Sequence, residues 1–204
     1  MNTRTYTRVN EDFLDDHQID VRNDIDIYEE VEKDVLNLLA DKDVAINLCE
    51  LPDSYYKVLE KDDLEDLIVK CVLKYGNDCN LNWIDVSQIT NMNDLFHHSY
   101  FHGDISRWNV HNVVTMEHMF DNSDFDGNIS QWDVRNVKMF NYMFKDSQFT
   151  GNISNWRTLS AWQMDGMFMG INESFNSDLS NWKTGTVYSM KNMFRNSNYD
   201  RDIS

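Results

Sequence analysis

Histidines are the residues of this 204-residue chain most able to do chemistry, because five of its six imidazoles lie between positions 97 and 118. These are His97, His98, His102, His111 and His118. Three imidazoles are enough to make a zinc site. These five, however, occupy different positions of the local sequence pattern, and neither a carboxylate nor a cysteine recurs with them. We therefore expect them in exposed turns, with no bound metal.

Catalytic motifs are missing from the sequence. It has no Gly-x-Ser-x-Gly elbow, no glycine-rich loop to hold a phosphate and no His-Glu-x-x-His helix. Methionines recur beside phenylalanines, a pattern typical of core filling rather than of a copper site. The sequence therefore predicts a protein that is not an enzyme and needs no cofactor.

Charge and hydrophobicity narrow the class of partner. The chain has 18 Lys and Arg against 35 Asp and Glu, for a formal net charge of -17. Nucleic acids and anionic membranes both need a basic surface, so direct binding to either is not expected. Hydrophobic residues make up 41% of the chain, which is enough to form a core. A folded, acidic protein with a protein partner is the expectation.

Cysteines and the N-terminus bear on location. The three cysteines, Cys49, Cys71 and Cys79, are odd in number and lack metal-type spacing, so we expect free thiols in a reducing compartment. The N-terminus has no apolar signal segment, and no run approaches 18 apolar residues. We expect a cytoplasmic protein of a bacterium or of a phage-infected bacterium.

The elements that would position a site divide the chain in three. Residues 1–80 carry 9 basic and 21 acidic residues, net -12, while residues 81–204 carry 9 and 14, net -5. We expect a loosely ordered segment at 1–20, a helical N-terminal cap at 21–78 and a repeat region at 79–204.

Three helices are expected in the cap. The first has apolar residues at helical spacing over 27–39 and an acidic opposite face, made of Glu29, Glu30, Glu32 and Asp34. A short second helix is expected over 55–59 after Pro52. The third is expected over 64–75, with Gly76 as its C-terminal cap.

A repeat of about 24 residues is the strongest pattern in the sequence. Its tryptophans are Trp83, Trp108, Trp132, Trp156 and Trp182, and its phenylalanines are Phe96, Phe120, Phe144, Phe168 and Phe194. This period is typical of a solenoid, in which turns stack because one turn cannot bury its own apolar edge. A further column, Asp104, Asn128, Asn152, Asp178 and Asp202, is expected to cap turns rather than to bind calcium.

The repeat carries a family resemblance. The run Phe-Asp-Gly-Asn-Ile-Ser-Gln-Trp-Asp-Val-Arg-Asn-Val at 125–137, with Tyr-Met-Phe at 142–144, closely resembles the repeat of BspA-like leucine-rich repeat surface proteins. The resemblance covers residues 62–204 in five units. It implies an α/β fold, a right-handed leucine-rich-repeat-like solenoid with a short parallel strand per turn, and a binding role without catalysis. Members of that family are commonly secreted or lipid-anchored.

The candidate site lies on the outward face of the turns. Because side chains alternate along an extended segment, two columns are expected to point outward. One is polar and contains Gln88, Asn112, Asn136, Ser160 and Thr186; the other contains Thr90, Val114, Lys138, Trp162 and Tyr188. Trp162 and Tyr188, with Lys138 beside them, could anchor a protein partner. Alternatively, Trp162 folds over the adjacent turn as filler beside Ala161.

Three functions remain open from sequence. The leading hypothesis is a non-enzymatic, intracellular protein-interaction module that uses the columns above. The alternative is an acidic inhibitor, such as a phage anti-defence or toxin-neutralising protein, whose carboxylates at 29–34 block a basic nucleic-acid-binding surface. A structural or adhesive surface protein is third. No polar helix follows the final turn, so we also expect a homodimer or a bound partner there.

Overall fold

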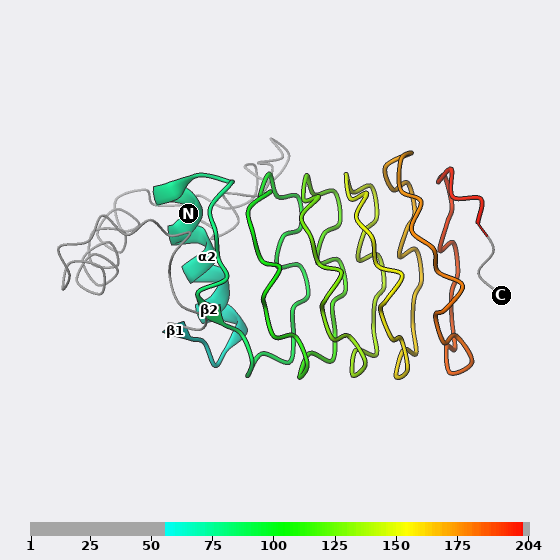
Figure 1. Ribbon diagram of the computed structural model, residues 1–204, viewed down its shortest axis with the longest axis horizontal. Helices are drawn as coiled ribbons and strands as arrows, with labels where there is room; N and C mark the ends of the chain where they lie inside the picture. The colour runs from blue at the N-terminus through cyan, green and yellow to red at the C-terminus, as the bar shows by residue number, and fades with distance from the viewer. Residues whose placement is uncertain (1–55, 202–204) are drawn as a thin grey trace, which may run out of the picture.

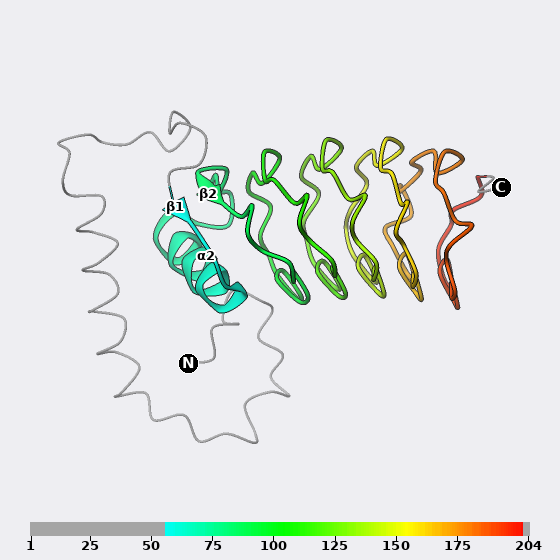
Figure 2. The same cartoon turned by 90° about the horizontal axis from the view of Figure 1, so that it is seen from below.

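The computed structural model describes residues 56–201, and it consists of one helix, two very short strands and a row of stacked turns (Figure 1). Strand β1 is Tyr56–Lys57, helix α2 is Lys61–Tyr75 and strand β2 is Ile84–Asp85. Beyond β2 the turns follow one another along the long axis as far as residue 201, and α2 lies at the opposite end (Figures 1 and 2). The helix expected over 27–39, the segment 1–20 and Cys49 lie outside the described residues.

Helix α2 forms where apolar side chains recur at helical spacing. Its buried residues are Leu64, Leu67, Ile68, Val69, Cys71 and Val72. Asp62 and Asp63 lie in its first turn and Lys74 in its last, which complements the helix dipole. Gly76 ends the helix with φ 85°, and its N–H donates to the carbonyl of Val72 at 2.8 Å. The predicted helix and its glycine cap are confirmed.

The prediction of a short helix after Pro52 is wrong. Residues Tyr56–Lys57 are extended and pair in parallel with β2, Tyr56 opposite Ile84 and Lys57 opposite Asp85. The N–H of Val58 continues the pairing to the carbonyl of Asp85 at 3.0 Å, and the Val58 side chain is buried. A helix here would remove these backbone bonds and turn Val58 out of the core, so pairing with a distant segment outweighs the local preference.

The turns are joined by parallel backbone bridges at one position of each repeat. Isolated bridges connect Asn91 to Thr115, Thr115 to Met139, Met139 to Gln163 and Gln163 to Ser189. Between these turns the strand that the resemblance implied is a single bridge rather than a run of paired residues, whereas β1 and β2 pair over two residues and a separate bridge joins Asn80 to Asp104. Further backbone hydrogen bonds on either side of the bridge, such as those from Met92 to Thr115 and from Phe96 to Met119, hold successive turns in register.

Aromatic columns fill the interior of the stack. Rings of the repeated phenylalanine stack from turn to turn, with centroid separations of 5.5 Å from Phe96 to Phe120, 5.5 Å from Phe120 to Phe144 and 5.8 Å from Phe144 to Phe168. These four side chains are buried, as are the methionines that precede three of them. The buried face of α2 belongs to the same core. The inward column predicted from the repeat is confirmed.

Side-chain oxygens stabilise one corner of each turn. Oδ1 of Asp104 accepts from the backbone N–H of Ser106 at 2.9 Å, and Asn128, Asn152 and Asp178 accept in the same way from the residue two positions on. These contacts confirm the predicted turn caps at those four positions.

Candidate functional site

One outward column is held together by a continuous line of backbone hydrogen bonds. Val114 donates to Thr90, Lys138 to Val114 and Trp162 to Lys138, each at 2.8 Å, and Tyr188 donates to Trp162 at 2.7 Å. The line fixes the five residues as neighbours on successive turns. The side chain of each is therefore positioned by backbone that belongs to the stack rather than by a free loop.

The column ends in an exposed aromatic pair. Trp162 is 55% exposed and Tyr188 is 78% exposed. Their ring centroids are 6.3 Å apart with an interplanar angle of 61°, an edge-to-face arrangement. Ala161, directly before Trp162, is buried, so the two side chains alternate between core and surface as an extended segment requires. The structure places the indole of Trp162 outside the core, against Tyr188, rather than over the adjacent turn as filler.

The side chain of Lys138 is exposed on the turn before Trp162. Its backbone carbonyl accepts from both Trp162, at 2.8 Å, and Gln163, at 3.1 Å. The lysine side chain is therefore the charged neighbour of the aromatic pair along the column. The arrangement brings together three residues that the sequence singled out: Lys138, Trp162 and Tyr188.

Side chains of the polar column form hydrogen bonds to the backbone of the neighbouring turn. The side-chain amide of Asn112 donates to the carbonyl of Ser87 at 2.8 Å, and that of Asn136 donates to the carbonyl of His111 at 2.8 Å. The hydroxyl of Thr186 donates to the carbonyl of Ala161 at 3.0 Å. These three side chains hold their turns to the turn before, and each uses a donor there. Glu29, Glu30, Glu32 and Asp34 lie outside the described residues.

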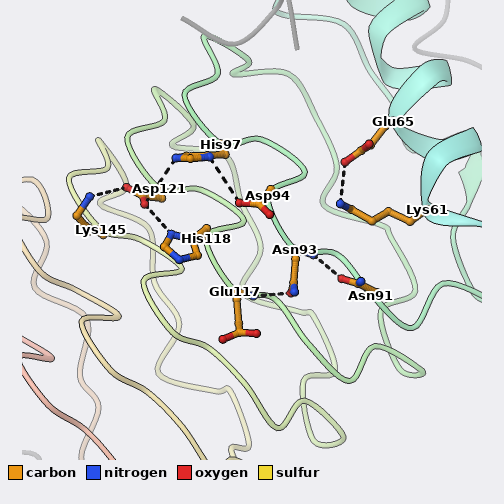
Figure 3. A network of polar contacts seen from close by, with 10 residues as sticks. All are labelled: Lys61, Glu65, Asn91, Asn93, Asp94, His97, Glu117, His118, Asp121 and Lys145. Carbon is orange, nitrogen blue, oxygen red and sulfur yellow. Dashed lines mark hydrogen bonds and ion pairs between the residues drawn. The ribbon is translucent and has the colours of Figure 1, made fainter. Parts of the chain in front are cut away.

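A polar cluster around Asp121 was not expected from the sequence (Figure 3). The Asp121 side chain is buried, and its carboxylate contacts Nδ1 of His118 at 2.8 Å, Nζ of Lys145 at 3.3 Å and Nε2 of His97 at 3.7 Å. Burial opposes ionisation of Asp121, but the hydrogen bond from His118 and the charges of Lys145 and His97 outweigh it, so its pKa is lowered. A carboxylate surrounded by three cationic or ionisable partners is a structural anchor between turns.

The two histidines of this cluster shift in opposite directions. The hydrogen bond to Asp121 raises the pKa of His118 above its ordinary value, whereas burial and the neighbouring His98 lower the pKa of His97. The His118 ring also stacks on Tyr142, with centroids 4.9 Å apart. His97 also contacts Asp94 at 3.5 Å and Lys145 also contacts Asp146 at 3.3 Å, so all three partners of Asp121 have a second contact within the stack.

A sequence signal for this cluster existed in the repeat itself. His97, Asp121 and Lys145 occupy one column, 24 residues apart, so stacking brings opposite charges onto neighbouring turns. Taken one turn at a time, the histidines showed no recurring carboxylate, because the sign of the charge changes from turn to turn in this column.

The described residues also show how potential metal ligands and cysteine thiols are arranged. Residues 56–201 contain no group of three or more His, Cys, Asp or Glu side chains arranged to hold a metal ion. Cys71 and Cys79 are free and buried, and burial raises the pKa of their thiols to about 12 and about 11. Thiols with such pKa values are poor nucleophiles at neutral pH. Within these residues no helix has the length and apolar character needed to span a membrane.

Comparison with known families gives a match over most of the chain. A family described as Mycoplasma protein of unknown function, DUF285, matches residues 64–173 and 125–204. The chain belongs to the DUF285 family. The matched DUF285 region runs from helix α2 through every turn of the stack, and its two matches overlap, as expected for a repeat that fits in more than one register. No curated protein and no solved structure matches this DUF285 chain.

Proposed function

We propose that this DUF285 chain is a non-enzymatic protein-binding module, and that Trp162 and Tyr188 are the anchor for its partner. The observation that carries the proposal is the exposed edge-to-face pair, 6.3 Å between centroids, at equivalent positions of consecutive turns. Large aromatic side chains lose little rotamer freedom on binding and dominate the affinity of many protein interfaces. Lys138, next in the column, supplies a charged edge to the apolar anchor.

The fold of this module is proposed to be a right-handed solenoid of the leucine-rich, BspA-like type. Support comes from parallel bridges that recur about every 24 residues and from the phenylalanine rings stacked at 5.4–5.8 Å across the turns. A rigid stack of this kind suits binding because its outward side chains are held in fixed positions before the partner arrives.

We also propose an intracellular location, which rests on the two free, buried thiols of Cys71 and Cys79. Free thiols persist in reducing compartments and are uncommon in oxidising ones. Four of the clustered histidines, which could have formed a zinc site, instead contact aspartates: His97, His102, His111 and His118.

Capture from a lysate of the native host tests the proposal. The immobilised chain should retain a protein that is also retained by a Leu73→Ala variant but lost from a Trp162→Ala variant. Leu73 is the matched control, because it is 61% exposed on α2, away from the column. Retention of the same proteins by all three chains would show that the pair is no anchor.

A further inference from the structure

Trp162 directly follows a tight backbone turn that recurs along the stack. The N–H of Ala161 donates to the carbonyl of Thr158 at 3.2 Å, which closes the turn, and Leu159 lies at its tip. Leu159 is 50% exposed, almost as much as Trp162. Two large apolar side chains are therefore exposed within four residues of each other.

The equivalent turn one repeat earlier has cations at the same two positions. It spans residues 134–137 and is closed in the same way at 3.0 Å, with Arg135 at its tip and Lys138 directly after it. Both side chains are exposed. Arg135 is thus the counterpart of Leu159, and Lys138 is the counterpart of Trp162. Because the N–H of Trp162 donates to the carbonyl of Lys138, the cations and the apolar side chains are neighbours on successive turns.

A third cation lies on the same turn as the apolar side chains. Arg157 is exposed two residues before Leu159. Arg135 pairs with Asp133 at 2.7 Å, whereas neither Lys138 nor Arg157 forms an ion pair with another residue of the range 56–201. Three cations and two apolar side chains thus form one cationic–aromatic patch: Arg135, Lys138, Arg157, Leu159 and Trp162.

The patch lies in two turns that each have a described turn on either side. Met139, in the first of them, bridges to Thr115 and to Gln163, and Gln163, in the second, bridges to Met139 and to Ser189. The exposure of the patch therefore comes from the outward direction of its side chains and not from a missing neighbour.

The patch also lies in the less acidic part of the stack. Residues 131–201 contain 8 basic and 6 acidic residues, net +2, whereas residues 56–130 contain 5 and 13, net -8. The equivalent segments of the earlier turns, residues 84–91 and 108–115, contain neither Lys nor Arg. Positive charge beside an exposed aromatic ring is therefore local to this part of the chain.

An apolar centre with cations around it is complementary to a protein segment that has carboxylates beside an apolar side chain. A long polyanion such as a nucleic acid fits less well, because beyond the patch it would meet the acidic surface of residues 56–130. The net charge of -17 favours a basic partner for the chain as a whole, whereas the local charge of the patch favours an acidic one at this contact.

We propose that the partner protein anchored by Trp162 is acidic where it touches this chain. An apolar side chain of the partner covers Leu159 and Trp162, and carboxylates beside it pair with Lys138 and Arg157. This inference rests on the proposed function, since it assigns the chemistry of the partner at the same anchor.

Selection from a random peptide library displayed on phage measures which residues the patch prefers. The full chain is the bait, and clones that the Trp162→Ala chain also retains are discarded. The remaining peptides should contain a large apolar residue with Asp or Glu near it, enriched about threefold or more over the unselected library, and should be depleted of Lys and Arg.

The tightest selected peptide is then the probe in a calorimetric titration. Lys138→Gln combined with Arg157→Gln should weaken its Kd about tenfold or more. Lys57→Gln combined with Lys74→Gln is the matched control, because it removes the same charge from exposed lysines outside the patch, and it should change Kd less than about twofold. Raising the ionic strength from about 0.05 M to about 0.5 M should weaken binding to the parent more than binding to the neutralised patch.

The failure of this inference is distinguishable from the failure of the proposed function. Peptides that depend on Trp162 but are basic or uncharged would overturn the acidic assignment and leave the proposed function standing. A selection without any peptide that depends on Trp162 would overturn both. The library leaves the protein unchanged, so the charge argument stays testable even if the doubly substituted chain fails to fold.

Two further results would assign the patch to a different partner and overturn the inference. One is a single-stranded DNA of about 16 nucleotides that binds the parent as tightly as the best peptide and is lost from Trp162→Ala. The other is self-association of the parent chain, measured by sedimentation, that Trp162→Ala abolishes.

Discussion

The indole N–H of Trp132 donates to the carbonyl of Ile105, 27 residues earlier, at 3.2 Å. Trp108, Trp156 and Trp182 make the same bond to the turn before, at 2.9, 3.0 and 3.2 Å. The repeat therefore needs tryptophan at this position, since phenylalanine would fill space without linking turns. Trp83 differs: its indole nitrogen is buried and has no partner in the part of the chain that the structure describes.

This difference predicts unequal costs for one substitution. Trp132→Phe removes a buried hydrogen bond, although the Ile105 carbonyl keeps the N–H of Trp108. Trp83→Phe makes the same replacement of an indole by a smaller phenyl ring, but it removes no hydrogen bond. The free energy of unfolding, measured by urea denaturation, should fall about 1 kcal/mol further for Trp132→Phe. An equal loss in the two variants would contradict the linking role.

Phe144, in the middle of the stack, should contribute more to the free energy of unfolding than Phe194 in the last described turn. Phe144 is fully buried and stacks on Phe120, Phe149 and Phe168. Phe144→Ala should lower the free energy of unfolding by about 3–5 kcal/mol, through lost burial and a cavity. Phe194→Ala should cost less, because that ring is only partly buried. Similar losses in the two variants, measured by urea denaturation, would contradict the difference in burial between the two rings.

Repetition explains which features the sequence could predict. Core columns recur in every turn, so their period identified Phe120 and Phe144 as inward. The alternation of side chains placed Trp162 in an outward column, but sequence alone left open that it folds over the adjacent turn. Residues 56–57 could not be predicted from local preference, because their pairing with β2 depends on a segment almost thirty residues away. The Asp121 cluster was missed for a different reason. Two of its partners, His97 and Lys145, lie in the same column as Asp121, where the sign of the charge alternates, so these contacts appear only when neighbouring turns are compared.

The histidines of the Asp121 cluster should titrate on opposite sides of their ordinary value. NMR titration of the ring resonances should give His118 a midpoint above 6.5 and His97 a midpoint below it. Asp121→Asn removes the hydrogen bond that raises the pKa of His118, and that midpoint should fall. Asp178→Asn, outside the cluster, is the control. A His118 midpoint that does not move in Asp121→Asn would contradict the assignment.

The same shifts set the pH range in which Asp121 matters. Folding lowers the Asp121 pKa, so its contribution is present above 3.8 and is lost as pH falls through the lowered value. Folding raises the His118 pKa, so that contribution is full below 6.5 and is lost as pH rises through the raised value. The His97 pKa is lowered, so its contribution is lost at acid pH. Asp121→Asn should therefore lower the free energy of unfolding most between pH 3.8 and pH 6.5.

The thiols of the chain should be masked by folding. Cys71 and Cys79 are buried with raised pKa values, so they should react slowly with a thiol reagent at neutral pH in the folded protein. The unreduced protein, once denatured, should show three reactive thiols, one for each cysteine. Finding a single reactive thiol would mean that two of them form a disulfide.

Truncation of Trp162 should affect partner binding and not folding. Truncation of an interface anchor should cost about 2 kcal/mol or more of binding, roughly thirtyfold in Kd, while leaving the fold intact. Truncation of a packing residue should instead lower the melting temperature and leave the affinity nearly unchanged. The 55% exposure of Trp162 and its contact with Tyr188 favour the first outcome.

Calorimetric titration of the captured partner into the Trp162→Ala chain, beside its thermal unfolding curve, tests most directly whether Trp162 anchors the partner. If Trp162 is the anchor, its truncation should weaken Kd about thirtyfold and leave the melting temperature close to that of the parent, and Leu73→Ala should keep full affinity. A folded Trp162→Ala chain that binds the partner as tightly as the parent does would contradict it.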